Sequence, residues 1–203
     1  MKDQGGETRE QILDAAMEHF AECGYKGASI SKIAEEAGVS KSLIFWYFNT
    51  KEMLFQSLVD RFAINCINNL NLSGPSGNAR VKMEYIIDSY WEFIRKNFKF
   101  VRIFMNWFIQ WDSKDKRRRD RMKNIHSKFR EILEFHIKEG INEGLFREDI
   151  DVHSTALSIV CCLEGLLLQI ILESVDFNNF KENFYVSLKR HLFEGIMNQD
   201  SKA

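Results

Sequence analysis

Residues 29 to 48 have the sequence SISKIAEEAGVSKSLIFWYF, which predicts two short helices around a tight turn. Gly38 suits the turn, because a residue without a side chain adopts a positive φ at no steric cost. Ser40 offers its hydroxyl to the free N–H groups of the second helix, which we expect over residues 41 to 48. The buried stripe of the first helix consists of Ile30, Ile33, Ala34 and Ala37. This order of elements is the helix-turn-helix pattern, whose second helix is able to enter the major groove of DNA.

The composition around this stretch favours an all-α protein. The chain has 203 residues, of which 45% are hydrophobic, and a single proline, Pro75, so long helices with a substantial core are expected. The four cysteines lack the spacing of a metal site, and the first residues, MKDQGGETREQ, lack the apolar segment of a signal peptide. We therefore expect a reduced, cytoplasmic protein without a metal or other cofactor.

Turn signals divide the chain into nine expected helices. Thr8 and Gln11 have the spacing of a capping box in the first of them, and Asn49 or Thr50 can cap the fourth. The segment NLSGPSGN, residues 71 to 78, is the clearest break. Outside the helix-turn-helix the expected helices run over about 7–23, from 51 towards the break, and over about 79–97, 99–111, 116–140, 152–173 and 178–197. We predict a helix-turn-helix domain over residues 1–51 and a helical domain over 52–203.

The charge is unevenly distributed. The formal net charge of the chain is −1, which argues against indiscriminate binding to nucleic acids. Within residues 26 to 51, however, four lysines face two glutamates, so this part has a net charge of +2. Because this positive charge is small, affinity for DNA would depend on geometry and dimerisation more than on the overall charge.

Residues 8 to 58 resemble the DNA-binding domain of the tetracycline-repressor (TetR) family of bacterial transcriptional regulators. The matching pieces are TREQILDAAMEHFAECGY, the serine at 29, ISKIAEEAGVSKS, the aromatic IFWYF and the trailing NTKEML. Beyond residue 58 the chain resembles the family only in its helical layout and in the Glu164-Gly165 pair within an apolar helix.

The resemblance implies a set of DNA-contacting residues. Lys41 would donate to guanine O6 and N7, Leu43 would pack on a thymine methyl group, and Lys51 would contact a phosphate. Ser29 would cap its helix and face a phosphate. The full set is Ser29, Ser31, Lys32, Ser40, Lys41, Ser42, Leu43, Phe45, Trp46, Tyr47 and Lys51.

Two residues depart from the family pattern, which leaves the operator sequence open. Phe45 stands where the family usually has tyrosine, so no hydroxyl contact is expected there. Ser42 stands where the family usually has glycine, and its hydroxyl is able to form a hydrogen bond. The alternative for Phe45 and Trp46 is plain core packing, which is the role that we expect for Phe48.

The most apolar stretch, ALSIVCCLEGLLLQIIL at 156–172, predicts a helix that is buried on all sides. Its polar interruptions and its length, below the roughly 20 residues of a bilayer span, argue against a membrane helix. The last helix has apolar residues every three or four positions, at Phe177, Phe180, Phe184, Leu188, Leu192 and Ile196. We therefore predict a homodimer whose interface lies within about 152–197 and whose two-fold symmetry reads a palindrome.

Residues 90 to 111 contain nine aromatic side chains, more than one packing stripe needs. An apolar cavity with a few polar anchors is the usual form of a small-ligand site, and a dry aromatic core is the alternative. The predicted lining for a small apolar or amphipathic effector is Trp91, Phe104, Trp107, Phe108, Gln110, Trp111, His126, Glu164 and Gln169.

Other functions find less support in the sequence. The basic run KDKRRRDRMK at 114–123 is either a solvated helix start or a supplementary patch for DNA or an acidic ligand. There is no Ser-His-Asp set, phosphate loop or dinucleotide motif, so no catalytic residue is predicted and no enzyme is expected.

The prediction is a ligand-responsive regulator, a repressor that binds a palindromic operator as a homodimer and is released by its effector. The first alternative is a ligand-independent structural or nucleoid protein of the same fold that binds many DNA sites. The second is a ligand-binding or enzymatic protein that has lost DNA recognition.

Overall fold

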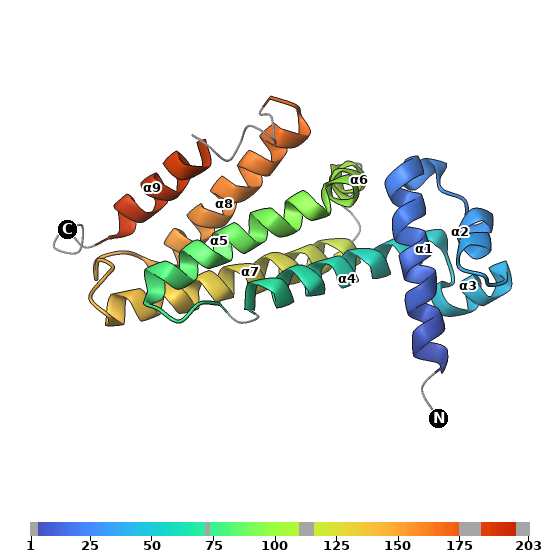
Figure 1. The fold of residues 1–203 in the computed structure, drawn as a ribbon, viewed down its shortest axis with the longest axis horizontal. Helices are drawn as coiled ribbons and strands as arrows, with labels where there is room; N and C mark the ends of the chain where they lie inside the picture. Colours follow the sequence, from blue (N-terminus) through green and yellow to red (C-terminus); the bar gives the residue numbers. More distant parts are fainter. Residues whose placement is uncertain (1–3, 72–73, 110–115, 175–183, 198–203) are drawn as a thin grey trace. The chain divides into compact units, whose positions relative to one another are not determined.

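The computed structural model describes residues 4–71, 74–109, 116–174 and 184–197, which form nine α-helices and no strand (Figure 1). The predicted all-α class is therefore confirmed. The helices are α1 (Gln4–Gly27), α2 (Ile30–Glu36), α3 (Lys41–Phe48), α4 (Lys51–Asn71), α5 (Ala79–Lys96), α6 (Phe98–Ile109), α7 (Lys116–Asn142), α8 (Val152–Ile171) and α9 (Phe184–Ile196).

The start of α1 differs from the prediction. The helix begins at Gln4 and not near Glu7, so Thr8 lies inside it and the expected capping box at its start is wrong. Inside a helix the backbone N–H groups that a capping box would engage are already bonded to carbonyls of the preceding turn. Gly24, with φ 70° and ψ 169°, breaks the helical geometry, so the regular part of α1 ends at the predicted Cys23.

The chain forms two compact units, which cut across the predicted boundary after residue 51. Unit 1 comprises Met1–Cys66 with Glu92–Asp115, and unit 2 comprises Ile67–Trp91 with Lys116–Ala203. Packing thus groups α6 with α1 to α3. The predicted boundary instead separates the expected DNA-binding part from the expected ligand-binding and dimerisation part. That boundary stays a prediction.

The core of unit 1 is an aromatic cluster around Phe55 of α4. Phe55 is fully buried, and its ring centre lies 5.0 Å from that of Phe20 and 5.1 Å from those of Tyr25 and Trp107. Edge-on and tilted pairs of this kind add about 0.5–1.5 kcal/mol each to the apolar burial. The cluster joins α1, α4 and α6, which gives the helix-turn-helix a rigid support.

An ion-pair cluster also links α1 to α4. The guanidinium of Arg61 donates to Asp14 Oδ1 at 2.7 Å and to Glu10 Oε2 at 3.2 Å. These two acidic residues of α1 therefore form ion pairs within unit 1.

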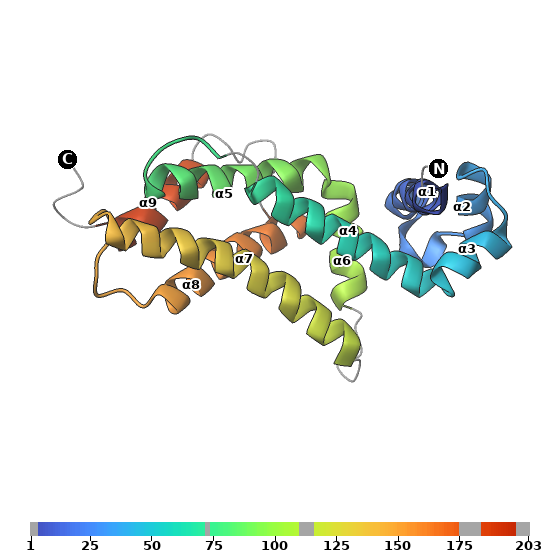
Figure 2. The ribbon, with the colours of Figure 1, turned by 90° about the horizontal axis from the view of Figure 1, so that it is seen from below.

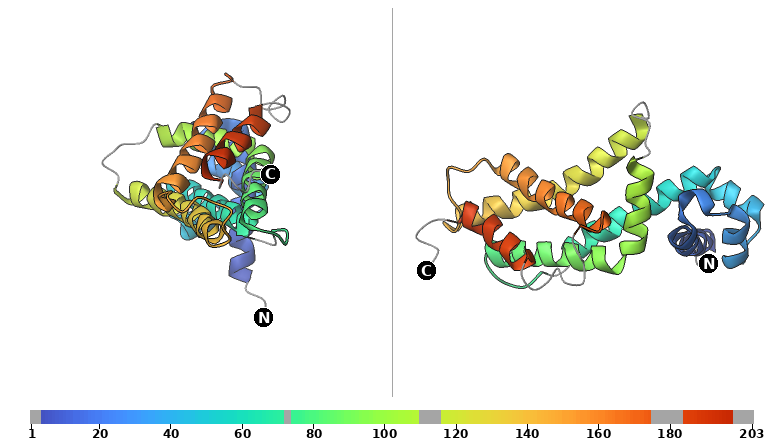
Figure 3. Two further views of the ribbon diagram at one scale, coloured as in Figure 1. Left: turned by 90° about the vertical axis from the view of Figure 1, so that its left-hand side faces the viewer. Right: turned by 90° about the horizontal axis from the view of Figure 1, so that it is seen from above.

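Unit 2 is built around α7 and α8, which lie side by side in Figures 2 and 3. Helix α5 packs on α7 through the stacked rings of Tyr90 and Phe129, whose centres are 5.2 Å apart. The guanidinium of Arg80 lies over the ring of Phe193, which brings α9 against α5. The side chains of α8 that are buried within the unit are Ala156, Ile159, Val160, Leu163, Leu166, Leu167 and Ile170.

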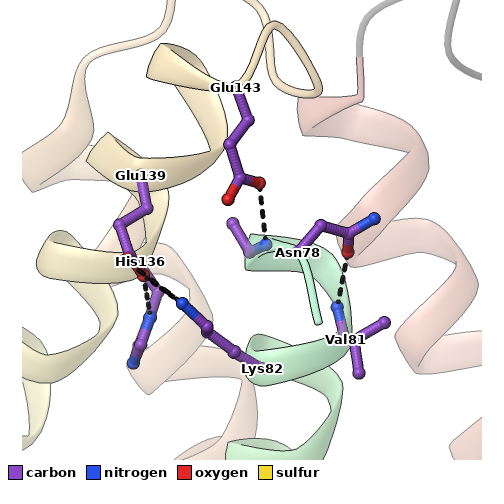
Figure 4. A network of polar contacts seen from close by, with 7 residues as sticks. Asn78, Val81, Lys82, His136, Glu139 and Glu143 are labelled. Atoms are coloured by element: carbon purple, nitrogen blue, oxygen red, sulfur yellow. Dashed lines mark hydrogen bonds and ion pairs between the residues drawn. The ribbon is translucent and has the colours of Figure 1, made fainter. Parts of the chain in front are cut away.

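Polar contacts fasten the start of α5 to the end of α7 (Figure 4). Glu143 Oε2 accepts the free backbone N–H of Ala79 at 2.9 Å, and Asn78 Oδ1 accepts that of Val81 at 3.1 Å. Lys82 donates to Glu139, which also pairs with Nδ1 of His136 at 2.6 Å. Glu143 and Asn78 thereby satisfy backbone N–H groups in the first turn of α5, which have no carbonyl partner within the helix.

The end of α7 depends on a glycine that makes room for a ring. A Cβ atom added at Gly140 would overlap the ring of Phe146 at Cδ2, and this side chain is fully buried. Backbone N–H groups of Leu145 and Phe146 both donate to the carbonyl of Gly140, which holds the ring in place.

We expect the substitution Gly140→Ala to destabilise the protein by about 1–3 kcal/mol, because a methyl group forces the buried Phe146 ring to move. Chemical denaturation of the purified variant measures the loss. Gly195→Ala is the matched control, since a Cβ at Gly195 of α9 meets no atom within 4 Å. Equal stability of the two variants would contradict the expected clash.

Candidate nucleic-acid interface

The turn between α2 and α3 has the geometry that residues 29 to 48 predict. Gly38 has a φ of +64°, in the left-handed region, and a Cβ there would be strained by its backbone alone. Ile33 and Ala34 of α2 and Ile44 of α3 are buried, so the two helices pack on the rest of unit 1 through their apolar sides.

The two predicted caps behave differently. Ser40 Oγ accepts the backbone N–H of Leu43 at 3.2 Å and lies 2.9 Å from the hydroxyl of Ser42, so Ser40 caps α3 as predicted. Ser29 occupies the position before α2, but its side chain makes no capping hydrogen bond there. The capping role expected for Ser29 is therefore wrong. Its backbone, with φ −114° and ψ 126°, has the extended form of an ordinary N-cap, so only the side-chain hydrogen bond is missing.

One side of α3 is open to solvent. Ile44 and Phe48 are buried, whereas Lys41, Ser42, Phe45 and Trp46 are exposed. Positions 41, 42, 45 and 46 lie on one side of a helix, because residues three or four apart share a face. The predicted base-contacting side chains of Lys41 and Ser42 are thus displayed together, while Leu43 is half-buried beside them.

The aromatic residues of α3 divide between core and surface. Phe48 is buried as predicted, with the guanidinium of Arg9 of α1 over its ring. Phe45 is 44% exposed and Trp46 is 73% exposed, so neither serves simply to fill the core. Tyr47 is half-buried and makes an edge contact with Trp46 at 4.7 Å between ring centres. Sequence reasoning missed Arg9, because a cation–π contact between distant helices leaves no periodic signal.

The three predicted DNA-contacting lysines lie in three different environments. Lys32 is exposed and donates to Glu35 at 2.9 Å, and this hydrogen bond raises the pKa of Lys32 and lowers that of Glu35. Lys41 is exposed and makes no ion pair among the residues that the structure describes. Lys51 is half-buried at the start of α4, and its Nζ donates to the carbonyls of Ala28 and Lys26. Ser31 is exposed near the start of α2.

Two family models match successive parts of this chain. The model for bacterial regulatory proteins of the tetR family matches residues 12–58, which include α2 and α3. The model for the C-terminal domain of tetracyclin repressor-like proteins matches residues 81–176.

The chain belongs to the TetR family of transcriptional regulators.

Some similar proteins match most of the chain, and others match a short part of it at higher identity. The fatty acid metabolism regulator protein of Bacillus subtilis (strain 168) is 27% identical over 146 residues, which are 70% of this chain and 72% of that protein. The HTH-type transcriptional regulator TtgR of Pseudomonas putida is 42% identical over 59 residues, or 29% of this chain and 28% of that protein. The solved structure of the fatty acid degradation regulator FadR from Bacillus halodurans has a TM-score of 0.70 at 22% identity, covering 93% of this chain and 95% of that one. This TetR-family protein is therefore a DNA-binding transcription regulator.

The predicted effector residues of this TetR-family regulator fall in both units. Phe104 and Trp107 lie in unit 1, where Trp107 is buried beside Phe55 and lines a hollow of about 340 Å³ with residues 23–27. Trp91 is buried in unit 2. Phe108 lies in α6 with its side chain outside the described part, and Gln110 and Trp111 are outside the described residues altogether. The site as a whole stays a prediction.

Apart from Gln110, the polar members of that set lie on α7 and α8. His126 Nδ1 is 2.6 Å from Glu164 Oε1, and this hydrogen bond raises the pKa of His126. Gln169 lies on the exposed side of α8 together with Leu168 and Leu172. In the basic run, Lys116, Arg119 and Lys123 are exposed, and the residues before 116 are outside the described ranges.

We expect the ion pair between His126 and Glu164 to make stability depend on pH. The pKa of His126 is raised above the unfolded value of about 6.5. The stabilisation is therefore complete below about pH 6.5 and is lost as the pH rises through the folded pKa. NMR titration of the His126 ring measures this pKa, which Glu164→Gln lowers. Glu173→Gln, which removes an exposed carboxylate just after α8, is expected to leave the titration unchanged.

Proposed function

We propose that the protein is a repressor that binds a palindromic operator as a homodimer and is released by a small apolar or amphipathic effector. The observation that carries the proposal is the open side of α3, where Lys41, Ser42, Phe45 and Trp46 are exposed together. A lysine donates to guanine O6 and N7, and apolar groups pack on thymine methyls, so this side is able to read the major groove.

The exposed side of α8 supports the homodimer. Leu157 is 43% exposed and Leu172 is 62% exposed, and Cys161, Gly165 and Leu168 between them are also open to solvent. These positions are three to four residues apart and form one apolar stripe on the helix, which favours burial against a second surface. Gly165 would allow two helices to approach closely.

Helix α9 contributes less to the predicted interface than its apolar spacing indicates. Ile196 is buried within unit 2 and Leu188 and Leu192 are half-buried, so part of the stripe is used inside one chain. Phe177 and Phe180 lie outside the described residues.

A membrane role for α8 is a weaker reading of the same hydrophobicity. The helix has 20 residues with a mean hydropathy of 1.9 in its most apolar window, so its length and composition allow a membrane span. The row of α8 side chains that is buried within unit 2, and the pairing of its Glu164 with His126, favour a helix packed within protein.

The class of effector follows from composition and from two relatives. The aromatic segment of residues 90 to 111 offers apolar surface for such a ligand. Two of the similar proteins are named as regulators of fatty acid metabolism and degradation. We therefore propose an effector with an apolar chain and a polar end.

Selection of duplexes from a random pool by the purified protein tests the proposal. We expect a palindromic sequence bound by two chains, and sedimentation should give twice the chain mass of 23.9 kDa. Genome-wide binding should show a few promoter sites. Hundreds of dispersed sites without a common palindrome would favour the structural DNA-binding protein, and no selected sequence would contradict both.

Release is tested separately with the selected duplex. Medium-chain and long-chain fatty acids are added to the complex, and dissociation is followed by fluorescence anisotropy of the labelled DNA. An effector shifts the equilibrium only as far as it prefers the released state. Unchanged binding across the series would reject this effector class and leave operator binding intact.

A further inference from the structure

Unit 1 carries an acidic cleft in addition to the exposed side of α3. The cleft has a volume of about 940 Å³ and is lined by residues of α1, the end of α2 and α4. Its charged lining consists of the four carboxylates of Asp14, Glu18, Glu22 and Glu36 and the guanidinium of Arg61. All of these residues belong to unit 1, so the cleft lies within one compact body.

Most of this negative charge is not neutralised within the chain. The guanidinium of Arg61 donates to Asp14 at 2.7 Å, which accounts for one carboxylate of the lining. Glu18 and Glu22 are exposed and make no ion pair among the residues that the structure describes. The cleft is therefore suited to a ligand that is positively charged.

A buried histidine behind the cleft is a second, independent observation. His19 is 8% exposed and is the one polar residue that is buried among those the structure describes. Its Nδ1 makes no hydrogen bond and is directed at Oε1 of Glu36, which is 3.4 Å away. Where the ring presents its lone pair, both atoms are acceptors, and an ammonium group that enters the cleft is the donor that they lack.

The spacing of the carboxylates favours an extended cation over a metal ion. In the described part of the chain, no group of three or more His, Cys, Asp or Glu side chains is close enough to hold a metal ion. Asp14, Glu18 and Glu22 are instead four residues apart on α1, which corresponds to intervals of about 6 Å along the helix. Amino groups separated by three or four methylene groups in an aliphatic polyamine are about 5–6 Å apart. Met17, which also lines the cleft, offers apolar surface to the methylene groups.

We propose that this cleft binds a linear aliphatic polyamine, whose ammonium groups pair with Glu18, Glu22 and Glu36. The carboxylates are open to solvent, so the binding is of modest strength and weakens as the salt concentration rises. The site is separate from the exposed side of α3 and from the aromatic segment of residues 90 to 111. It therefore depends neither on an operator nor on the proposed effector.

Calorimetric titration of the free protein with spermidine at low salt tests the proposal. The double substitution Glu18→Gln with Glu22→Gln keeps the shape of both side chains but removes their charges. We expect it to weaken spermidine binding roughly fivefold or more, because two ion pairs are lost.

The matched control is Glu131→Gln with Glu148→Gln, which removes two exposed carboxylates of unit 2 and changes the net charge equally. We expect this variant to bind spermidine as the wild type does. Equal weakening in the two double variants would overturn the proposal, because the effect would then reflect the overall charge. Wild-type binding in the variant of Glu18 and Glu22 would overturn it as well.

Two simpler cations test the need for several spaced charges. Butylamine carries one ammonium group, and Mg²⁺ carries its charge at a single point. We expect both to bind more weakly than spermidine at the same salt concentration. Binding of Mg²⁺ as tight as that of spermidine would contradict the match between the carboxylate row and an extended cation.

A measurement on the wild type covers the case in which the variant of Glu18 and Glu22 does not fold. The ring signals of His19 and His153 are followed by NMR as spermidine is added. An ammonium group at Glu36 changes the surroundings of the His19 ring, so its signals should shift and reach a plateau, whereas those of His153 in unit 2 should stay in place. Signals of His19 that do not move, or that move only together with those of His153, would overturn the proposal.

Discussion

Lys41→Ala is expected to weaken binding to the selected duplex by roughly 30-fold or more. Lys41 is exposed at the start of α3 and makes no ion pair among the described residues, so it is available to a base. A good contact from a lysine to guanine contributes about 1–3 kcal/mol of discrimination, and a homodimer loses two of them. The combined loss is about 2–6 kcal/mol, in which each 1.4 kcal/mol is a factor of ten. Fluorescence anisotropy at fixed salt measures it.

The control for this variant is Lys138→Ala, which removes an exposed lysine of α7. It changes the net charge equally, so it reports any general electrostatic effect. Selection with Lys41→Ala should also relax the preference at one base position in each half-site. If the variant bound the operator as tightly as Lys138→Ala does, Lys41 would not contact a base and the recognition surface of α3 would need to be reassigned.

Phe55→Ala is expected to destabilise the protein by about 3–5 kcal/mol, the range for removing a buried aromatic ring. Phe55 is fully buried and its ring lies against Phe20, Tyr25, Phe100 and Trp107, so the cavity would open at the centre of unit 1. The aromatic cluster supports α1 and α4, and DNA binding should fall together with stability. Denaturant unfolding followed by circular dichroism gives the free energy of unfolding.

Met53→Ala is the neighbouring control for the core substitution. Met53 precedes Phe55 by two positions on α4 and is 46% exposed, so its truncation should change stability by no more than about 0.5 kcal/mol. A loss of similar size in both variants would mean that the aromatic cluster does not carry the stability of unit 1.

Local chemistry explains why much of the DNA-binding part was predictable. The positive φ of Gly38, the cap at Ser40 and the burial of Phe48 each depend on a residue and its neighbours within one or two helical turns. Thr50 also accepts the N–H of Met53, which selects Thr50 over Asn49 as the cap of α4. Thr8 failed as a cap because α1 begins earlier, at Gln4, whereas Ser29 has the backbone of an N-cap but its side chain makes no capping hydrogen bond.

Contacts between residues that are far apart in the sequence were less predictable. Lys51 occupies a position that the family resemblance assigns to a phosphate, yet its partners in the free protein are backbone carbonyls some 23 to 25 residues earlier. Every residue carries such a carbonyl, so no pattern in the amino acids marks these two. Trp107 illustrates the same limit, because its aromatic character suits either a ligand pocket or the packing that it makes with Phe55.

The amino-acid sequence alone was sufficient to predict the helices, the turn and the exposed surface of α3. These features depend on hydrophobic periodicity, capping residues and glycine, which act over only a few residues. Folding in three dimensions then assigned the partners: Lys51 to carbonyls, Arg61 to the acids of α1, and the ring of Phe146 to the space at Gly140. Such partners depend on how distant segments meet, and the chemistry of a single residue does not specify which neighbour it will find.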